Sequence, residues 1–451
     1  MDSKLYELDN KDKKKLEEIS DAIWGYAETR YEEYNSAKIQ MEYLEQQGFF
    51  ITKQLGGIKT AFKATAGSGK PVIALLGEFD ALPGMSQTVD MAVEMPEKKG
   101  APGHGCGHNL LGVGSMEAAL ILKNHMEKNN LSGTVHYYGC PAEESGAGKA
   151  FMVRANCFHN VDFALTWHPF QQNGIMNRSL SNIRVIFEFL GKSAHASANP
   201  EEGRSALDAC ELMNVGVNYL REHVIPQARM HYAYLDAGGK APNIVPHKAS
   251  LLYALRAPKA TYVQELLHRV SDIAKGAALM TGTLVQIKVV SAYSDILAVP
   301  QMDYLLRECM EEVLPIAYTE EEYAYANKYI DENRNIDANE SISNTIAPED
   351  SKISMGSTDV GDVSWNVPTG SIYVTTMSAG SIMHGWSVVA QGKSSIAYKG
   401  MHAAAQILAE AGIRILKSEE LQKKIRDSFE QAKGTQQYKS MIPENVLPGE
   451  F

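Results

Sequence analysis

Four short apolar segments, each followed by an acid or a histidine, limit the folds that are open to this chain. They are residues 72–76 before Glu78 and Asp80, 134–138 before Glu143 and Glu144, 161–165 before His168, and 371–375 before His384. Such runs are typical of strands that are buried on both faces of a parallel sheet. Because ligands bind beyond the carboxyl ends of these strands, we expect the polar side chains to meet at one edge of a single sheet.

A loop with two histidines and a cysteine adds candidate ligands. Residues 104–108 read His-Gly-Cys-Gly-His, and the helical spacing of apolar residues from 109 to 126 places His108 at the start of a helix. A hydrolytic metal site needs three or more converging thiolate, imidazole or carboxylate ligands and one open position for water. The pattern therefore predicts a metal-dependent hydrolase. For His104, capping of nearby backbone is the simpler interpretation.

A different pattern begins near residue 182. Extended segments at 182–190, 229–235, 249–256 and 284–290 alternate with helical segments at 205–223 and 262–280. The order β-α-β-β-α-β is that of a ferredoxin-like unit. We therefore expect an α/β catalytic domain, with a mixed, mainly parallel sheet flanked by helices, formed by residues 1–181 and 298–451. An α+β lid or dimerisation domain is inserted at 182–297, and the acidic segment 319–350 is expected to be a surface excursion.

Composition narrows the class of protein. The formal charge of −11 disfavours nucleic acid as a partner, and five cysteines in 451 residues argue against a disulfide framework. There is no signal-peptide-like start and no apolar stretch near the roughly 20 residues that span a membrane, so we expect a cytoplasmic enzyme. The string Ala-Gly-Ser-Gly-Lys at 66–70 precedes a strand and is followed by Pro71, which predicts a turn and not a phosphate-binding loop.

Several longer strings resemble the aminoacylase/carboxypeptidase family of metal-dependent amidohydrolases, peptidase family M20. They are residues 78–84, the Gly-Cys-Gly-His loop, 141–144, 191–196 and His384. Because it contains a cysteine, this loop resembles the loop of the branch that contains the indole-acetyl-amino-acid and hippurate hydrolases. Residues 164–169, 356–365 and 384–386 resemble the hydrolases of p-aminobenzoyl-glutamate. The resemblance extends from about residue 14 to 415.

This resemblance implies two divalent metal ions per subunit, zinc or manganese. The implied metal ligands are Cys106, His108, Glu144, His168 and His384. Glu143 is the implied general base, which agrees with the chemistry of two adjacent acids: one binds metal while the other takes a proton from the attacking water. Many family members have a histidine where this chain has Glu78. Since Cys106 and His108 replace that ligand, we expect Asp80 to orient ligands without binding metal.

The inserted domain supplies candidates for substrate binding. The resemblance implies that His195 crosses to the active site of a partner subunit and stabilises the oxyanion, which requires a homodimer or a heterodimer with a paralogous subunit. Asn243 is the implied amide-binding residue and Arg256 the implied carboxylate-binding residue. The alternatives are a histidine that stabilises its own turn and an arginine that is a solvated strand residue.

The predicted function is hydrolysis of the amide bond of a small-molecule N-acyl or N-aroyl amino acid, p-aminobenzoyl-glutamate or a relative. One alternative keeps the chemistry and changes the substrate to another N-acyl amino acid or a small dipeptide. A second is a non-catalytic metal-binding subunit of a paralogous hydrolase, although such a subunit has no need for an unligated Glu143 beside the metal. A redox protein built on Cys106 would lack the usual Cys-x-x-Cys pair.

Overall fold

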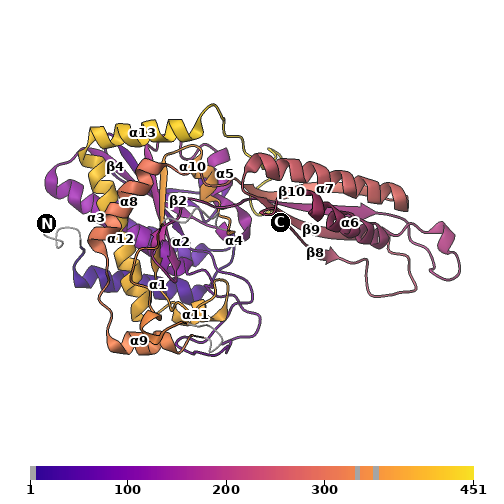
Figure 1. The fold of residues 1–451 in the computed structure, drawn as a ribbon, viewed down its shortest axis with the longest axis horizontal. Helices are drawn as coiled ribbons and strands as arrows, with labels where there is room; N and C mark the ends of the chain where they lie inside the picture. The colour runs from indigo at the N-terminus through magenta and orange to yellow at the C-terminus, as the bar shows by residue number, and fades with distance from the viewer. Residues whose placement is uncertain (1–6, 331–335, 349–354, 451) are drawn as a thin grey trace. The chain divides into compact units, whose positions relative to one another are not determined.

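The computed structural model describes residues 7–330, 336–348 and 355–450 (Figure 1). Contacts divide the described chain into two compact units. The larger unit takes its residues from 1–178, 297–352 and 363–438, and the smaller unit from 179–296, 353–362 and 439–451. The domain bounds at 182 and 297 stay a prediction from the sequence. No described helix has the length and apolar character needed to cross a membrane.

A seven-stranded mixed sheet forms the larger unit, in the order β1-β2-β4-β3-β5-β11-β6. Its central strands β4, β3, β5 and β11 are parallel neighbours, and β1, β2 and β6 pair antiparallel. This confirms the α/β class and the mixed sheet. All residues of β3 and β4 are buried, as their apolar sequences predict. The strands are β1 (Phe50–Lys53), β2 (Phe62–Ser68), β3 (Val72–Glu78), β4 (Gly133–Cys140), β5 (Phe163–Phe170), β6 (Gly174–Ile175) and β11 (Thr369–Thr375).

Helix α3 lies in the larger unit, and its side chains are mostly buried. Helix α12, near the other end of the sequence, packs beside α3 (Figure 1). Helix α3 therefore begins, at His108, from a fixed position in the core. The helices are α1 (Asn10–Tyr26), α2 (Tyr34–Gln46), α3 (His108–Asn129), α4 (Glu143–Gly146), α5 (Gly148–Arg154), α8 (Pro300–Val313), α9 (Glu320–Asn327), α10 (Val360–Ser364), α11 (Trp386–Gln391), α12 (Ser395–Lys417) and α13 (Glu419–Lys433).

The smaller unit has a four-stranded antiparallel sheet in the order β10-β7-β9-β8, with two helices. Its elements follow the chain order β-α-β-β-α-β, which confirms the ferredoxin-like prediction. Burial alternates along β7 and β9, because one face of each strand packs on the helices. The elements are β7 (Ser181–Leu190), α6 (Ala206–Leu220), β8 (Arg229–Asp236), β9 (Lys248–Ala257), α7 (Ala260–Thr281) and β10 (Leu284–Tyr293).

The prediction that 319–350 is only a surface excursion is wrong for its described part. Helix α9 begins with a capping box, in which the Thr319 side chain accepts from the Glu322 amide and the Glu322 side chain accepts from the Thr319 amide. Ala326 and Ile342 are buried in a small core with Ile396 of α12. Two apolar residues spaced sixteen positions apart give no helical or strand period, so the sequence pattern could not indicate this core. Residues 331–335 and 349–350 lie outside the described part.

Candidate metal centre

The carboxyl ends of the parallel strands bring the predicted ligands together. Strand β3 ends at Glu78, two residues before Asp80, and β4 leads into Glu143 and Glu144 of the short helix α4. His168 lies inside β5, opposite Tyr373 of β11, and not beyond the strand end as predicted. The apolar run that marked this strand was only its first half, so its end was placed too early.

Seven side chains form three overlapping groups of three, and within each group the possible ligand atoms lie within 4.8 Å of one another. Two of these groups share a thiol. The groups are Cys106 with His108 and His168, Cys106 with Glu144 and His384, and Glu78 with His108 and Glu143. All five predicted ligands and the predicted base are therefore gathered at one place in the larger unit. Cys106 is shared by the first two groups, and His108 by the first and the third.

Asp80 connects two candidate ligands. Its Oδ1 lies 3.0 Å from Nδ1 of His108, and its Oδ2 accepts a hydrogen bond of 2.9 Å from the Glu144 amide. A carboxylate that binds Nδ1–H fixes the imidazole tautomer and directs Nε2 to the metal side. This arrangement fits the orienting role expected for Asp80.

His168 is oriented in the same way by backbone. Its Nδ1 donates to the Pro169 carbonyl at 2.7 Å, and its Nε2 lies 3.4 Å from Sγ of Cys106. Gly107 permits this approach: its φ is +75°, and a Cβ there would lie 2.9 Å from Cβ of Pro169. A larger residue at 107 would push the Cys-Gly-His loop away from β5.

His384 is tied to the same loop although it comes from a distant part of the sequence. Its amide donates to the Gly105 carbonyl at 2.9 Å, and its Nε2 lies 3.4 Å from Oε2 of Glu144. The residue has a left-handed backbone with φ 59°, uncommon for a residue with a side chain. With 54% of its side chain exposed, His384 forms the open side of the site.

Sequence reasoning missed a buried ion pair at the site. Lys149 of α5 is fully buried, and its Nζ lies 2.7 Å from Oε1 of Glu78, whose Oε2 lies 3.3 Å from Nε2 of His108. The available signal was Glu78 itself, because the family resemblance implies a histidine ligand at this position. Nothing in the string around Lys149 indicated its partner.

Burial dominates the electrostatics of these groups. It raises the pKa of Glu144 to about 7, with Asp80 adding to the rise and His108 opposing it. Burial also raises the pKa of the Cys106 thiol well above its usual range. For His168, burial and then His108 lower the pKa to about 4, which keeps the imidazole neutral, as a metal ligand must be.

The donor set fits divalent metal ions. Nε2 of His108 is buried, and its contact with Glu78 at 3.3 Å does not have the geometry of a hydrogen bond. The three groups together offer one thiol, three imidazoles and three carboxylates, which are ligands for zinc, and the carboxylates and imidazoles also suit manganese. A cation would also draw the proton from the Cys106 thiol, which burial alone retains.

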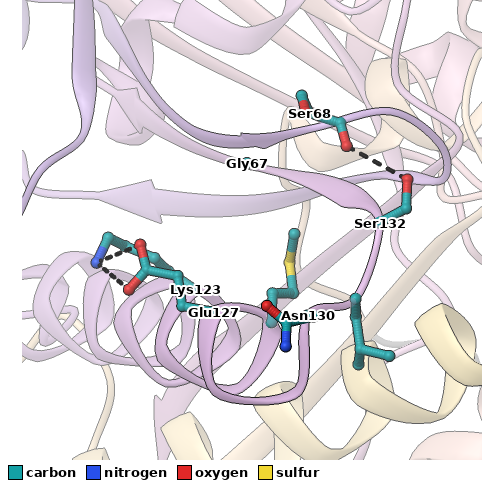
Figure 2. A pocket seen from close by; sticks show the side chains of 8 residues that line it. Gly67, Ser68, Lys123, Glu127, Asn130 and Ser132 are labelled. Carbon is teal, nitrogen blue, oxygen red and sulfur yellow. Dashed lines mark hydrogen bonds and ion pairs between the residues drawn. The ribbon is translucent and has the colours of Figure 1, made fainter.

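Two other sequence predictions are confirmed outside the site. Nε2 of His104 lies 3.0 Å from the Ile23 carbonyl, so this histidine contacts backbone. Residues 69–71 connect β2 to β3 as the predicted turn. Figure 2 shows that the glycine string borders a surface pocket at the end of α3, where Lys123 pairs with Glu127. No candidate site residue lines this pocket.

His195, Asn243 and Arg256 lie in the smaller unit. The turns of the first two are adjacent: His195 bridges Ile244, and the Ala196 amide donates to the Asn243 carbonyl at 3.0 Å. Nδ1 of His195 accepts from the amides of Ser197 and Ala198, which leaves the proton of the neutral ring on the exposed Nε2. Arg256 pairs with Asn182 on β7 and Arg229 on β8, and its buried Nε has no hydrogen-bond partner among the described residues.

Comparison with known proteins identifies the family. Residues 175–280 match the peptidase dimerisation domain of M20 proteins. The chain is 40% identical over 463 residues to the B subunit of p-aminobenzoyl-glutamate hydrolase from Escherichia coli (strain K12), with 97% of this chain and 96% of the relative covered. It is 32% identical over 286 residues to Xaa-Arg dipeptidase of Mus musculus, covering 61% of this chain and 62% of that protein.

A solved structure has the same fold. The crystal structure of a Bacillus subtilis protein, described as a dinuclear metal-binding peptidase from the M20 family, aligns with a TM-score of 0.60 at 17% identity and covers 91% of this chain and 99% of that one. Together with the identity over nearly the whole sequence, this establishes the relationship. The chain belongs to the M20 peptidase family, whose members are hydrolases that act on amide bonds.

Proposed function

We propose that this chain is a metal-dependent amidohydrolase that cleaves N-acyl or N-aroyl amino acids, with p-aminobenzoyl-glutamate as the first candidate substrate. The observation that carries the proposal is the convergence of Cys106, His108, Glu144, His168 and His384 beside Glu143. The substrate is suggested by the relative that is 40% identical over 97% of this chain, the B subunit of p-aminobenzoyl-glutamate hydrolase.

In this proposal Cys106, His108, Glu144, His168 and His384 would hold two divalent ions, zinc or manganese. Bound metal would lower the pKa of the attacking water and polarise the scissile carbonyl. Glu143 accepts the proton of the water and passes it to the leaving nitrogen. Asp80 and the Pro169 carbonyl hold His108 and His168 in the tautomers that ligation requires.

The smaller unit would recognise the substrate. We assign the exposed Nε2–H of His195 to the oxyanion in the active site of a partner subunit, because the turn already uses Nδ1 as an acceptor. Asn243 would bind the amide, and Arg256 the carboxylate of the amino acid, through two parallel hydrogen bonds. The match to a peptidase dimerisation domain supports a dimer. The 40% identical relative is one subunit of its hydrolase, so the proposed partner is either a second copy of this chain or a paralogous chain.

The proposal is tested by incubating the protein, loaded with zinc or manganese, with a panel of amides. The panel contains p-aminobenzoyl-glutamate, hippurate, indole-acetyl-aspartate and a dipeptide that ends in arginine, and release of the free amino acid is followed. We expect turnover to be highest for p-aminobenzoyl-glutamate. Preference for the dipeptide would favour the alternative suggested by the Xaa-Arg dipeptidase relative.

Two variants separate an enzyme from a metal-binding scaffold. Glu143→Gln keeps the shape of the side chain but cannot accept a proton, so turnover should fall about 10²-fold or more while metal content persists. Glu127→Gln is the control, because Glu127 lines the remote pocket of Figure 2, and it should retain full turnover. A wild-type protein that holds metal but cleaves no amide, alone or with its paralogous subunit, would favour the scaffold.

A further inference from the structure

Glu33 is a buried acid for which the proposed chemistry has no use. It precedes α2 and is fully buried. Its Oε1 accepts hydrogen bonds of 2.9 Å from two amides, those of Tyr31 and Ala142, and its Oε2 accepts one of 2.9 Å from Oγ1 of Thr60. A buried carboxyl with three donors is held in one place. One of these donors, Ala142, directly precedes the proposed base.

The segment that Glu33 contacts has an uncommon backbone. Ala142 and Ala147, which flank α4, both have left-handed conformations, with φ 61° and φ 60°. Such conformations are unfavourable for residues with a Cβ and persist only where the surroundings impose them. They turn the chain sharply at both ends of the four residues that include Glu143 and Glu144. The position of both acids therefore depends on what holds this turn.

The loop before α2 contacts both ends of the turn. Glu33 binds the Ala142 amide at its start, and the Tyr31 hydroxyl donates to the Gly146 carbonyl at 2.6 Å at its end. Packing is close here: a Cβ on Gly146 would lie 2.6 Å from Cβ of Ala142 and 2.7 Å from the Tyr31 ring. Because the Tyr31 amide also binds Glu33, one carboxyl joins the two contacts.

We propose that Glu33 is a positioning residue that fixes the turn carrying Glu143 and Glu144. This inference rests on the proposed roles of those two acids. Glu33 touches neither the reacting atoms nor a proposed ligand, so it acts through the backbone of Ala142. Burial, followed by the charge of Asp80, raises the pKa of Glu33 to about 8. A neutral amide is therefore a close mimic of this carboxyl at neutral pH.

The test uses two variants of Glu33 and one matched control. Glu33→Ala removes the acceptor, whereas Glu33→Gln keeps an acceptor oxygen for the two amides. Gln40→Ala is the control, because Gln40 is also fully buried and hydrogen-bonded on α2 but contacts Tyr137 and Ser36 instead of the turn. All three are compared in kcat, KM and thermal unfolding.

We expect Glu33→Ala to lower kcat on the order of 10²-fold with KM unchanged, as a displacement of about 1 Å at a catalytic group does. Glu33→Gln should restore most of kcat, and Gln40→Ala should lower the unfolding temperature without this loss. If Glu33→Ala folds poorly, Tyr31→Phe removes only the contact at the other end of the turn and should lower kcat in the same direction. Equal kcat losses in Glu33→Ala and Gln40→Ala at equal loss of stability would overturn the proposal.

A second measurement does not depend on turnover. Zinc has no visible spectrum, but Co²⁺ absorbs according to the geometry of its ligands, and Glu144 in the same turn is a proposed ligand. We expect Glu33→Ala to change the visible spectrum of the Co²⁺-loaded protein, and Glu33→Gln and Gln40→Ala to leave it as in the wild type. If the wild type cleaves no amide, the proposed function fails, and this spectrum still decides the role of Glu33: an unchanged spectrum in Glu33→Ala rejects it.

Discussion

Replacing Gln391 by leucine tests how the loop that carries His384 is held in place. Gln391, at the end of α11, is fully buried. Its Oε1 accepts from the Ser378 amide at 2.8 Å, and its Nε2 donates to Oγ of Ser381 at 2.7 Å and to the Ser387 carbonyl at 2.8 Å. These three bonds span the loop that carries His384. Leucine keeps most of the volume but removes all three.

The expected loss of metal affinity follows from these three hydrogen bonds. Each is worth roughly 1 kcal/mol net, so the loop loses about 3 kcal/mol of support. The left-handed backbone of His384 already costs on the order of 1 kcal/mol. If the lost support must be regained when metal binds, affinity at the position formed by Cys106, Glu144 and His384 should fall about 10²-fold. The position formed by Cys106, His108 and His168 should be spared.

The assay is a metal titration against a competing chelator, which resolves two binding events. Gln422→Leu is the matched control, since Gln422 is a buried glutamine of α13 that donates to the Ile415 carbonyl and belongs to no candidate group. We expect one weakened event in Gln391→Leu and none in Gln422→Leu. Two events of wild-type affinity in Gln391→Leu, or equal weakening of both, would refute the reasoning.

Three further predictions concern the shared thiol, the smaller unit and a buried histidine. Cys106→Ala should lose more metal by elemental analysis than His168→Ala, because Cys106 belongs to two of the candidate groups and His168 to one; equal losses would argue against a shared thiol. If two copies of this chain form the dimer, co-expressed Glu143→Gln and His195→Ala chains, purified as a mixed dimer through different tags, should regain activity at one site. Activity no higher than in either parent would mean that His195 does not act in a second copy of this chain. His402 binds Glu117 at 2.7 Å and Glu17 at 3.2 Å; burial lowers its pKa, but these acids outweigh burial and raise it above 6.5. The contribution of protonated His402 to the free energy of unfolding should therefore be complete below pH 6.5 and lost as the pH rises through the raised pKa. Denaturation of His402→Phe at several pH values should lack this pH dependence.

The gathering of the candidate ligands was predictable because it depends on strand direction. Apolar runs of strand length indicated β3, β4, β5 and β11, and parallel pairing places their carboxyl ends at one edge. The order of elements in the smaller unit could also be predicted from the sequence. Apolar and polar side chains alternate along β7 and β9, because each strand has one buried face. Both predictions use periodicity, which is a local property of the sequence.

The polar residues that support the site could not be predicted in the same way. Glu33 and Lys149 are buried and are hydrogen-bonded or ion-paired to segments far away in the sequence. Gln391 is also buried, and its partner Ser378 lies across the His384 loop. In sequence each looks like an ordinary surface residue of a helix or a loop, since single polar residues have no period. Only the fold shows that their partners are Ala142, Glu78 and Ser378.

Strand β11 has a consequence for the order in which this protein is made. It pairs with β5 along seven residues and with β6 on its other side, yet both partners are translated almost two hundred residues earlier. Until β11 leaves the ribosome, the buried apolar strand β5 has an unpaired edge, and such edges are templates for aggregation. The nascent chain must therefore keep this sheet edge protected through the synthesis of residues 179–296 of the smaller unit, and a chain that stops before residue 369 has no strand with which to cover it.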